Sequence, residues 1–402
     1  MHPWTGDLLT VIEQQTMEFN ETNLWGIKIN TVSAGSIDNL FATVSAGLEN
    51  DNFPHLVAGN SDHLQYWYKK YKMAIDLTSY INDNQWGITE NGELLPKYLI
   101  QDQNDGSQIG IPALRDGQVL FYNQGWANDL GFQTPPETLE EFKAQVCAAA
   151  AANRNDEIAE NDGTGGLIIN NNSLVLVSWL FAHSTNPFPA NPDDSYQINT
   201  PEASQALRYL RELYDKNCAW NSRLPEPYEY FATRHALFYS GTLQDISTQQ
   251  QASNWLQSDD AWTVIPFPAN NGEPIMLVSG QSYGIFETTP EEQLAAWIFL
   301  RWLLLPRHQM NIVQSSNTLP LSNNILKDIS NSRDLSLQLS QTTKLSNCVE
   351  PIPALASWHL ISPIFEDLSW QLYYNETVEA SDITLYLQLT DTMIKEILEY
   401  EQ

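Results

Sequence analysis

Short apolar strands alternate with amphipathic helices along the whole of this 402-residue chain. Turn residues bound the strand candidates, and a polar segment followed by a helix comes after several of them. This alternation favours an α/β architecture, in which helices cover a sheet. We expect strands at residues 26–32, 56–58, 108–111, 119–122, 166–169, 262–265 and 283–286.

Three helix starts carry recognisable capping chemistry. Residues 200–202 and 289–291 both read Thr-Pro-Glu, which places a hydroxyl at the N-cap, proline at the first helical position and a carboxylate in the first turn. Thr138 and Glu141 have the spacing of a capping box. Helical spacing of apolar residues follows each of these starts, so the pattern predicts a helix after each one.

Composition limits the partners of the chain. There are 49 Asp and Glu residues against 19 Lys and Arg, which gives a formal net charge of −30 at pH 7. Such a surface repels polyphosphate, so we expect no nucleic acid as a partner and no anionic membrane surface. At this length, and with 42% hydrophobic residues, the chain can form two cores. Its most apolar run, residues 294–305, is too short to cross a bilayer and contains Arg301.

The three cysteines, Cys147, Cys218 and Cys348, are far apart and lack the spacing of a metal site. Because Cys147 lies in a helical apolar pattern, we expect it to be a buried free thiol. One disulfide bridge with one thiol left over is the alternative in an oxidising compartment.

Catalytic and cofactor motifs are scarce. The chain contains no glycine-rich nucleotide loop and no His-Glu-x-x-His motif, so we expect no cofactor and no metal. Residues 280–284 match Gly-x-Ser-x-Gly, but a nucleophile elbow needs a helix directly after the serine. A strand is expected there instead, so we interpret the match as chance. A catalytic pair of carboxylates for glycoside hydrolysis stays an open alternative. With 49 acidic residues in the chain, two carboxylates near each other in sequence give almost no evidence for such a pair.

Aromatic residues are numerous, with 13 Trp, 17 Tyr and 14 Phe. Trp4, Trp86, Trp126 and Trp220 lie beside Gly, Asn or Pro rather than within apolar runs. An indole face suits stacking against a sugar ring, although core packing is the alternative for any single Trp. Polar segments such as residues 170–173 carry the amides and hydroxyls that sugar hydroxyls require.

The segment from residue 110 to residue 142 resembles a known family. It carries Gly-Ile-Pro at 110–112, Leu-Phe-Tyr-Asn at 120–123, Leu-Gly-Phe at 130–132 and Pro-Pro-Glu-Thr-Leu-Glu-Glu-Phe at 135–142. These motifs resemble the bacterial ABC-transporter extracellular solute-binding proteins of family 1, in the sugar-binding branch that includes maltodextrin-binding protein. Further matches follow in chain order at residues 19–20, 35–36, 53–57, 75–78, 231–238, 278–285 and 317–320.

The resemblance implies the type II periplasmic-binding-protein fold, an α/β structure of two lobes joined by crossing hinge strands, with the ligand cleft between them. The first lobe would comprise residues 1–112 plus 266–319, and the second residues 113–265 plus 320–402. Only a ligand that contacts both lobes favours the closed state.

By the same resemblance, the closed lobes would deliver a sugar or oligosaccharide to the membrane permease of an ABC importer. The receptor would be a monomer, periplasmic or extracellular, with a lipoprotein anchor in the full-length form. The family begins with an export signal and a first strand. Since this sequence begins inside the loop that follows that strand, we expect both to be missing from it.

Ligand-binding positions carried over from the family are candidates. In the first lobe they are Trp4, Asp7, Asn60, Ser61, Gly280 and Gln281, and in the second lobe they are Asp116, Asn172, Ser173, Thr242 and Trp358. The resemblance implies that Asp7 accepts hydrogen bonds from sugar hydroxyls and that Trp358 closes over a sugar ring. Leu243 stands where sugar-binding relatives often have a nearby Trp, which weakens the expectation of stacking there.

Two other functions stay open. One is a secreted carbohydrate-active enzyme that uses paired carboxylates. The other keeps the fold but binds a polyamine, a peptide or a metal complex, because an acidic surface attracts cations.

Overall fold

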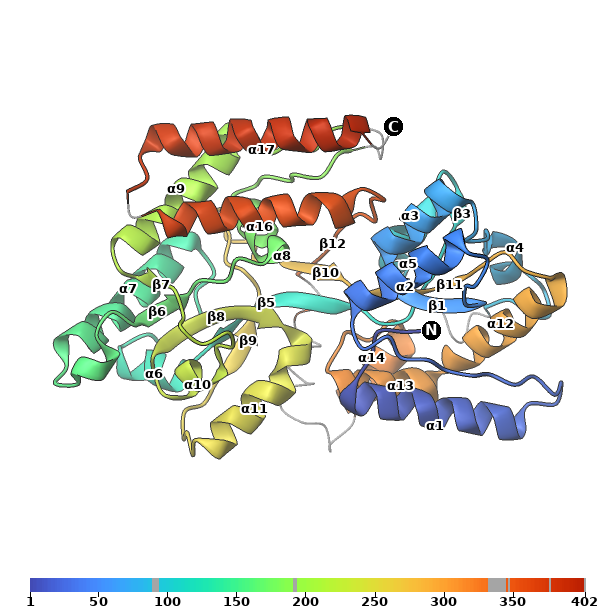
Figure 1. Ribbon diagram of the computed structural model, residues 1–402. Helices are drawn as coiled ribbons and strands as arrows, with labels where there is room; N and C mark the ends of the chain where they lie inside the picture. The colour runs from blue at the N-terminus through green and yellow to red at the C-terminus, as the bar shows by residue number, and fades with distance from the viewer. Residues whose placement is uncertain (89–93, 191–193, 332–344, 346–347, 376, 401–402) are drawn as a thin grey trace. The chain divides into compact units, whose positions relative to one another are not determined.

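The computed structural model describes residues 1–88, 94–190, 194–331, 345, 348–375 and 377–400. Backbone contacts divide the chain into two compact units, each discontinuous in sequence. Unit 1 comprises Met1–Asp116, Val278–Lys344 and Pro351–His359, and unit 2 comprises Gly117–Leu277, Leu345–Glu350 and Leu360–Gln402. Figure 1 shows that each unit has a sheet and helices of its own.

These unit boundaries differ from the lobe boundaries expected from the sequence. The first two passages between units lie after residues 116 and 277, whereas the sequence placed them after residues 112 and 265. Helix α14 (Asn323–Asn331), expected in the second lobe, packs in unit 1. The reason is a small apolar cluster, in which Ile325 and Ile329 of α14 contact Val313 of α13 (Pro306–Ser316).

Unit 1 contains a three-stranded antiparallel sheet with the order β1 (Leu56–Asn60), β11 (Gln281–Ile285) and β4 (Ile111–Pro112). Strands β2 (Gln103–Asn104) and β3 (Ser107–Gln108) form a separate hairpin. One apolar core cluster of the unit surrounds the fully buried Trp67 and Phe286. The remaining helices of unit 1 are α1 (Gly6–Thr22), α2 (Ile37–Glu49), α3 (Ser61–Tyr71), α4 (Thr78–Ile81), α5 (Pro96–Leu99), η2 (Ile100–Asp102) and α12 (Pro290–Leu303).

Unit 2 is built on a larger mixed sheet. Its strand order is β12 (Val349–Pro351), β10 (Met276–Ser279), β5 (Asp116–Tyr122), β8 (Ala236–Thr242), β6 (Gly165–Ile168) and β7 (Ala219–Trp220), with β9 (Thr263–Ile265) also paired to β5. Strand β5 runs antiparallel to β8, whereas β6 is parallel to both β7 and β8. Strands β5, β10 and β12 each contain a passage between the units.

The helices of unit 2 lie around this sheet (Figure 1). They are α6 (Gln124–Asp129), α7 (Leu139–Asn155), η3 (Ala159–Asn161), α8 (Ser173–Ala182), α9 (Pro201–Asp215), α10 (Tyr228–Ala232), η4 (Leu243–Asp245), α11 (Ile246–Trp255), α16 (Trp358–Tyr374) and α17 (Ala380–Tyr400). Helix α16 begins in unit 1 and continues in unit 2.

The helix caps predicted from the sequence are confirmed. Thr138 and Glu141 form a reciprocal capping box at the start of α7. The Thr200 hydroxyl accepts a hydrogen bond from the Ala203 amide at the start of α9, and Thr289 forms a capping box with Glu292 in α12. In these cases the threonine side chain at the N-cap accepts a hydrogen bond from an otherwise free amide of the first helical turn.

Most of the predicted strands are confirmed, but two predictions are wrong. Residues 108–111 divide between β3 and β4 instead of forming one strand. Residues 26–32 form no strand. The backbone groups of Ile27 and Ile29 are instead hydrogen-bonded to the side chains of Asn23 and Asn20.

The expectation of a free thiol at Cys147 is also wrong. Cys147 in α7 forms a disulfide with Cys218, which directly precedes β7, across a sequence separation of 71 residues. Helix α7 packs against β6 and β7, and this packing brings the two cysteines together. Cys348 is free and half-buried.

None of the described helices combines the length and the apolar character that crossing a lipid bilayer requires.

Candidate ligand-binding site

Three of the predicted site residues form one hydrogen-bonded chain in unit 1. Trp4 Nε1 donates to Gln281 Oε1 at 3.3 Å, and Gln281 Nε2 donates to Asn60 Oδ1 at 3.0 Å. They meet because Asn60, the last residue of β1, lies directly opposite Gln281, the first residue of β11. We call Trp4, Asn60 and Gln281 the amide relay.

Ser61 joins a second polar group next to this relay. Its hydroxyl lies 3.2 Å from the hydroxyl of Ser282, and Ser282 donates to Asp102 Oδ2 at 2.7 Å. Ser282 is fully buried inside β11, with no helix directly after it. The Gly-x-Ser-x-Gly match at residues 280–284 is therefore a chance match, as the sequence predicted.

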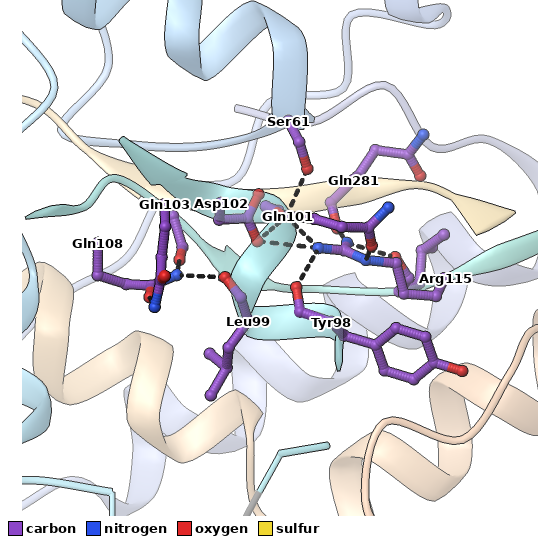
Figure 2. A network of polar contacts seen from close by, with 12 residues as sticks. Ser61, Tyr98, Leu99, Gln101, Asp102, Gln103, Gln108, Arg115 and Gln281 are labelled. Atoms are coloured by element: carbon purple, nitrogen blue, oxygen red, sulfur yellow. Dashed lines mark hydrogen bonds and ion pairs between the residues drawn. The ribbon is translucent and has the colours of Figure 1, made fainter. Parts of the chain in front are cut away.

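Arg115 organises the base of the site (Figure 2). Its guanidinium is completely buried and donates to Asp102 Oδ2 at 2.8 Å, to Gln101 Oε1 at 2.7 Å and to the Gln281 carbonyl at 2.9 Å. Burial lowers the pKa of Arg115, and the Asp102 carboxylate opposes that shift. Arg115 thus fixes the backbone at Gln281, from which the amide relay extends.

Gly280 serves this arrangement through its backbone. It has φ of +156°, and a Cβ at this position would collide with the Leu114 carbonyl oxygen. This close approach requires glycine. The packing of the backbone therefore explains the glycine at position 280 without any ligand.

Three other predicted residues of unit 1 lie on separate elements. Asp7 is exposed in the first turn of α1. Asp116 is buried at the first residue of β5, and Trp358, which is 7% exposed, begins α16.

Unit 2 contains a polar pocket of about 520 Å³. Three segments form most of its wall, namely the loop between β6 and α8, the end of β8 with the turn after it, and residues 221–228. Its polar lining consists mostly of neutral amides and hydroxyls. These polar residues are Gln118, Asn170, Asn171, Asn172, Asn221, Ser222, Tyr228, Tyr239, Ser240 and Thr242, with Glu226 and Asp245 as the two carboxylates.

The Asn170–Asn172 loop is ordered by its own hydrogen bonds. Asn172 caps α8 by accepting from the Leu174 amide at 2.9 Å, and Asn170 Nδ2 donates to the Ser240 carbonyl at 3.2 Å. Asn172, which the sequence predicts as a ligand-binding residue, lines the pocket. Ser173 is instead the buried first residue of α8, outside the pocket lining.

Thr242 lines the same pocket and belongs to a capping box with Asp245. The second oxygen of Asp245 accepts a hydrogen bond from the Tyr228 hydroxyl at 2.9 Å. Burial raises the pKa of Tyr228, and the charge of Asp245 raises it further. The phenol is therefore a neutral hydrogen-bond donor held at the pocket wall.

Tyr239 provides the strongest chemical signal in the pocket. Its side chain is 1% exposed, and its hydroxyl is buried without a hydrogen-bond partner among the described residues. Its ring is stacked on Phe121, with centroids 4.4 Å apart and planes 9° apart, which fixes the hydroxyl in place. An unpaired buried hydroxyl costs free energy that a ligand can recover by bonding to it.

A shallower pocket of about 460 Å³ adjoins the same loop. Glu366, Asp367 and Trp370 of α16 line it together with Asn170–Asn172. Trp370 is 46% exposed and stacks on Tyr374 with a centroid distance of 4.1 Å. Trp370 could not be identified from the sequence, because a Trp within a helical apolar pattern is indistinguishable from a core residue.

Residues 14–334 match the model of a bacterial extracellular solute-binding protein family. The chain belongs to this family. The resemblance found in the sequence is therefore confirmed, and the mixed α/β structure is that of the two-lobed solute-binding proteins.

Solved structures of solute-binding proteins match over almost the whole chain. The sugar-binding protein MalE from Xanthomonas citri matches with a TM-score of 0.81 and 15% identity, covering 100% of this chain and 98% of its own. The cyclic α-maltosyl-1,6-maltose binding protein from Arthrobacter globiformis has a TM-score of 0.78 and 16% identity, with coverage of 99% and 98%. UgpB from Mycobacterium tuberculosis, solved in complex with glycerophosphocholine, has a TM-score of 0.77 and 12% identity, with coverage of 100% and 98%. No curated protein matches in sequence.

Proposed function

We propose that this solute-binding protein captures a neutral sugar or oligosaccharide. The observation that carries the proposal is the lining of the unit 2 pocket, which consists of asparagine amides, hydroxyls and Tyr239, whose phenol has no hydrogen-bond partner among the described residues. Sugar hydroxyls both donate and accept hydrogen bonds, and this mixed set of groups serves both roles. The sugar-binding proteins with the same fold support the proposal.

In this proposal each unit contributes part of the ligand contacts. Unit 1 offers the amide relay and Ser61, and unit 2 offers Asn172, Thr242 and Tyr239. Asp7, Asp116 and Trp358 would add contacts, while Ser173 and Gly280 would shape the backbone beside the ligand. A ligand held by both units lowers the free energy of the closed state relative to the open state.

The proposed receptor delivers its ligand to the permease of an ABC importer. The family is extracellular, so the protein would act outside the cytoplasm, as a monomer and with a lipid anchor in the full-length form. It would bind its solute without catalysing a reaction, as the members of its family do.

A small cationic ligand is the second candidate. The carboxylates of Glu226 and Asp245 line the pocket beside the ring of Tyr228. A carboxylate pair with an aromatic ring suits a polyamine or a quaternary ammonium group. The fold shared with the glycerophosphocholine complex is compatible with this alternative.

A thermal-shift panel tests the proposal, because a ligand that binds the native state raises the melting temperature. The panel contains maltose, maltotriose, a cyclic glucan, spermidine, glycerophosphocholine and a tripeptide. Stabilisation by one of the saccharides supports the proposal, and stabilisation by spermidine or glycerophosphocholine alone refutes it. New reducing ends after incubation with the oligosaccharides would instead identify a carbohydrate-active enzyme.

A further inference from the structure

The shallow pocket of about 460 Å³ shares a wall with the larger polar pocket of unit 2. The shared wall is the Asn170–Asn172 loop, which joins β6 to α8 and lines both pockets. Glu366, Asp367 and Trp370 of α16 form the rest of the shallow pocket. We call this space the α16 pocket. Because the same three residues line both spaces, the two pockets adjoin.

Hydrogen bonds to three elements of unit 2 hold the shared loop in place. Ser369 Oγ donates to Asn171 Oδ1 at 3.1 Å, which ties the loop to α16. Asn170 is hydrogen-bonded to the Ser240 carbonyl of β8, and Asn172 caps α8. The loop is therefore ordered before any ligand arrives, so binding there costs little conformational entropy.

The wall of the α16 pocket offers both hydrogen-bond donors and acceptors. Asn171 and Asn172 use their side-chain oxygens in the bonds to Ser369 and Leu174, while their Nδ2 groups have no partner among the described residues. Glu366 forms no hydrogen bond and no ion pair within the part of the chain that the structure describes. Its carboxylate is therefore free to accept hydrogen bonds from a ligand.

Trp370 gives the α16 pocket an apolar surface. Its indole stacks on Tyr374, with centroids 4.1 Å and planes 18° apart, and this contact fixes the orientation of the ring. The Trp370 side chain nevertheless remains 46% exposed, and Tyr374 is 67% exposed. A large, rigid and exposed aromatic surface beside hydrogen-bonding groups is typical of a contact site and not of a core.

A saccharide ring matches this combination of groups. Its C–H face packs on an indole, and its hydroxyls both donate and accept hydrogen bonds. A cation would also suit Trp370 and the carboxylates of Glu366 and Asp367. An ammonium group can only donate, however, so it would leave the free amide groups of Asn171 and Asn172 without an acceptor. The mixed donors and acceptors therefore favour a sugar.

We propose that the α16 pocket is a second saccharide subsite, in which one ring of an oligosaccharide packs on Trp370 while neighbouring rings occupy the polar pocket of unit 2. Asn171 and Glu366 bind hydroxyls of the ring that packs on Trp370. The inference rests on the proposed function and narrows it, because a ligand that fills both pockets is an oligosaccharide. Affinity then increases with chain length until one ring reaches Trp370.

Isothermal titration calorimetry with glucose, maltose, maltotriose and maltohexaose tests the proposal. Trp370→Ala should lower the affinity for maltohexaose by about 3- to 10-fold, because it removes the aromatic surface under one ring. Trp255→Ala is the matched control, since Trp255 is 84% exposed at the end of α11 and lines neither pocket. This control should bind maltohexaose as the wild-type protein does.

Fluorine NMR reports on Trp370 directly. In protein labelled with 5-fluorotryptophan, the Trp370 signal is the one that is missing from Trp370→Phe. Saturating maltohexaose should shift this signal, and spermidine should leave it in place.

Three results would overturn the proposal. The first is wild-type affinity of Trp370→Ala for maltohexaose together with an unshifted Trp370 signal, and the second is an equal loss of affinity in Trp255→Ala. In both cases a saccharide still binds, so the proposed function stands and only the subsite fails. The third is a Trp370 signal that spermidine shifts and maltohexaose does not, which would identify a cation site. Absence of heat from every saccharide would instead refute the proposed function, and the subsite with it.

Discussion

The guanidinium of Arg115 and the carboxylate of Asp102 lie 2.8 Å apart in unit 1, and neither side chain is more than 1% exposed. Removing one partner of a buried ion pair leaves an uncompensated charge, which costs about 3–5 kcal/mol. We therefore expect Arg115→Met to lower the free energy of unfolding by that amount in urea denaturation.

Arg307 provides the matched control for this substitution. It forms an ion pair with Glu18 at the same distance, 2.8 Å, but the two side chains are 62% and 42% exposed. Arg307→Met should cost less than about 1 kcal/mol. If Arg115→Met lowers the free energy of unfolding as little as Arg307→Met does, the Arg115 network does not stabilise unit 1.

The disulfide between Cys147 and Cys218 should stabilise unit 2 by about 2–4 kcal/mol, because it restricts the unfolded chain. We expect Cys218→Ser to lower the urea midpoint of the protein under oxidising conditions. The urea midpoint of this variant should be the same with and without dithiothreitol. Cys348→Ser is the control, since Cys348 is free, and the protein carrying it should retain its sensitivity to the reductant. A denatured, unreduced wild-type protein with three reactive thiols would contradict the pairing.

Tyr239→Phe separates ligand binding from stability. The hydroxyl has no partner in the described structure, so its removal should not destabilise the fold. If a ligand hydroxyl bonds to it, the affinity should fall by about 3- to 10-fold. Isothermal titration calorimetry measures the change.

Tyr283→Phe is the control for this variant. Tyr283 also has a buried hydroxyl without a partner in the described residues, but it lies in β11 of unit 1 and does not line the unit 2 pocket. Its substitution should leave the sugar affinity unchanged. An equal loss of affinity in both variants would argue against a role of Tyr239 in the unit 2 pocket.

His308 predicts a loss of stability in acid. Burial lowers its pKa to about 4, and the neighbouring Arg307 lowers it while Glu18 opposes the shift. In the folded state its Nε2 accepts a hydrogen bond from Arg307 Nε at 3.1 Å, which a protonated imidazole cannot do. In the unfolded chain this histidine binds a proton near pH 6.5. The contribution of neutral His308 to the free energy of unfolding is therefore complete above that pH and is lost as the pH falls toward 4.

His308→Asn should flatten the stability profile between pH 6.5 and pH 4, as measured by urea denaturation at each pH. A profile for His308→Asn that is parallel to the wild-type profile would contradict the assignment.

Local chemistry explains which parts of the fold were predictable from the sequence. The caps at Thr138, Thr200 and Thr289 depend on residues within one helical turn, so their spacing was sufficient. Residues 26–32 have the pattern of a strand, but a strand also needs a hydrogen-bonded neighbour, and that requirement is not visible in the segment itself. The disulfide depends on the packing of α7 against β7, which no spacing rule contains.

The candidate site shows the same division. Asn60 and Thr242 end strands, Gln281 begins one and Asn172 follows one, so their positions were predictable from strand ends and from the family resemblance. Tyr239 lies within β8, and its importance arises from an unpaired hydroxyl that only the packed structure reveals. Arg115 was missed because a single arginine in the sequence carries no sign of burial.

Isothermal titration of the wild-type protein, Asn172→Ala and Tyr239→Phe with maltotriose and with a cyclic glucan tests the central claim most directly. The account predicts saturable binding of at least one of these saccharides to the wild-type protein, weakened in both variants. Glycerophosphocholine or spermidine binding to the wild-type protein, with no heat from either saccharide, would contradict it.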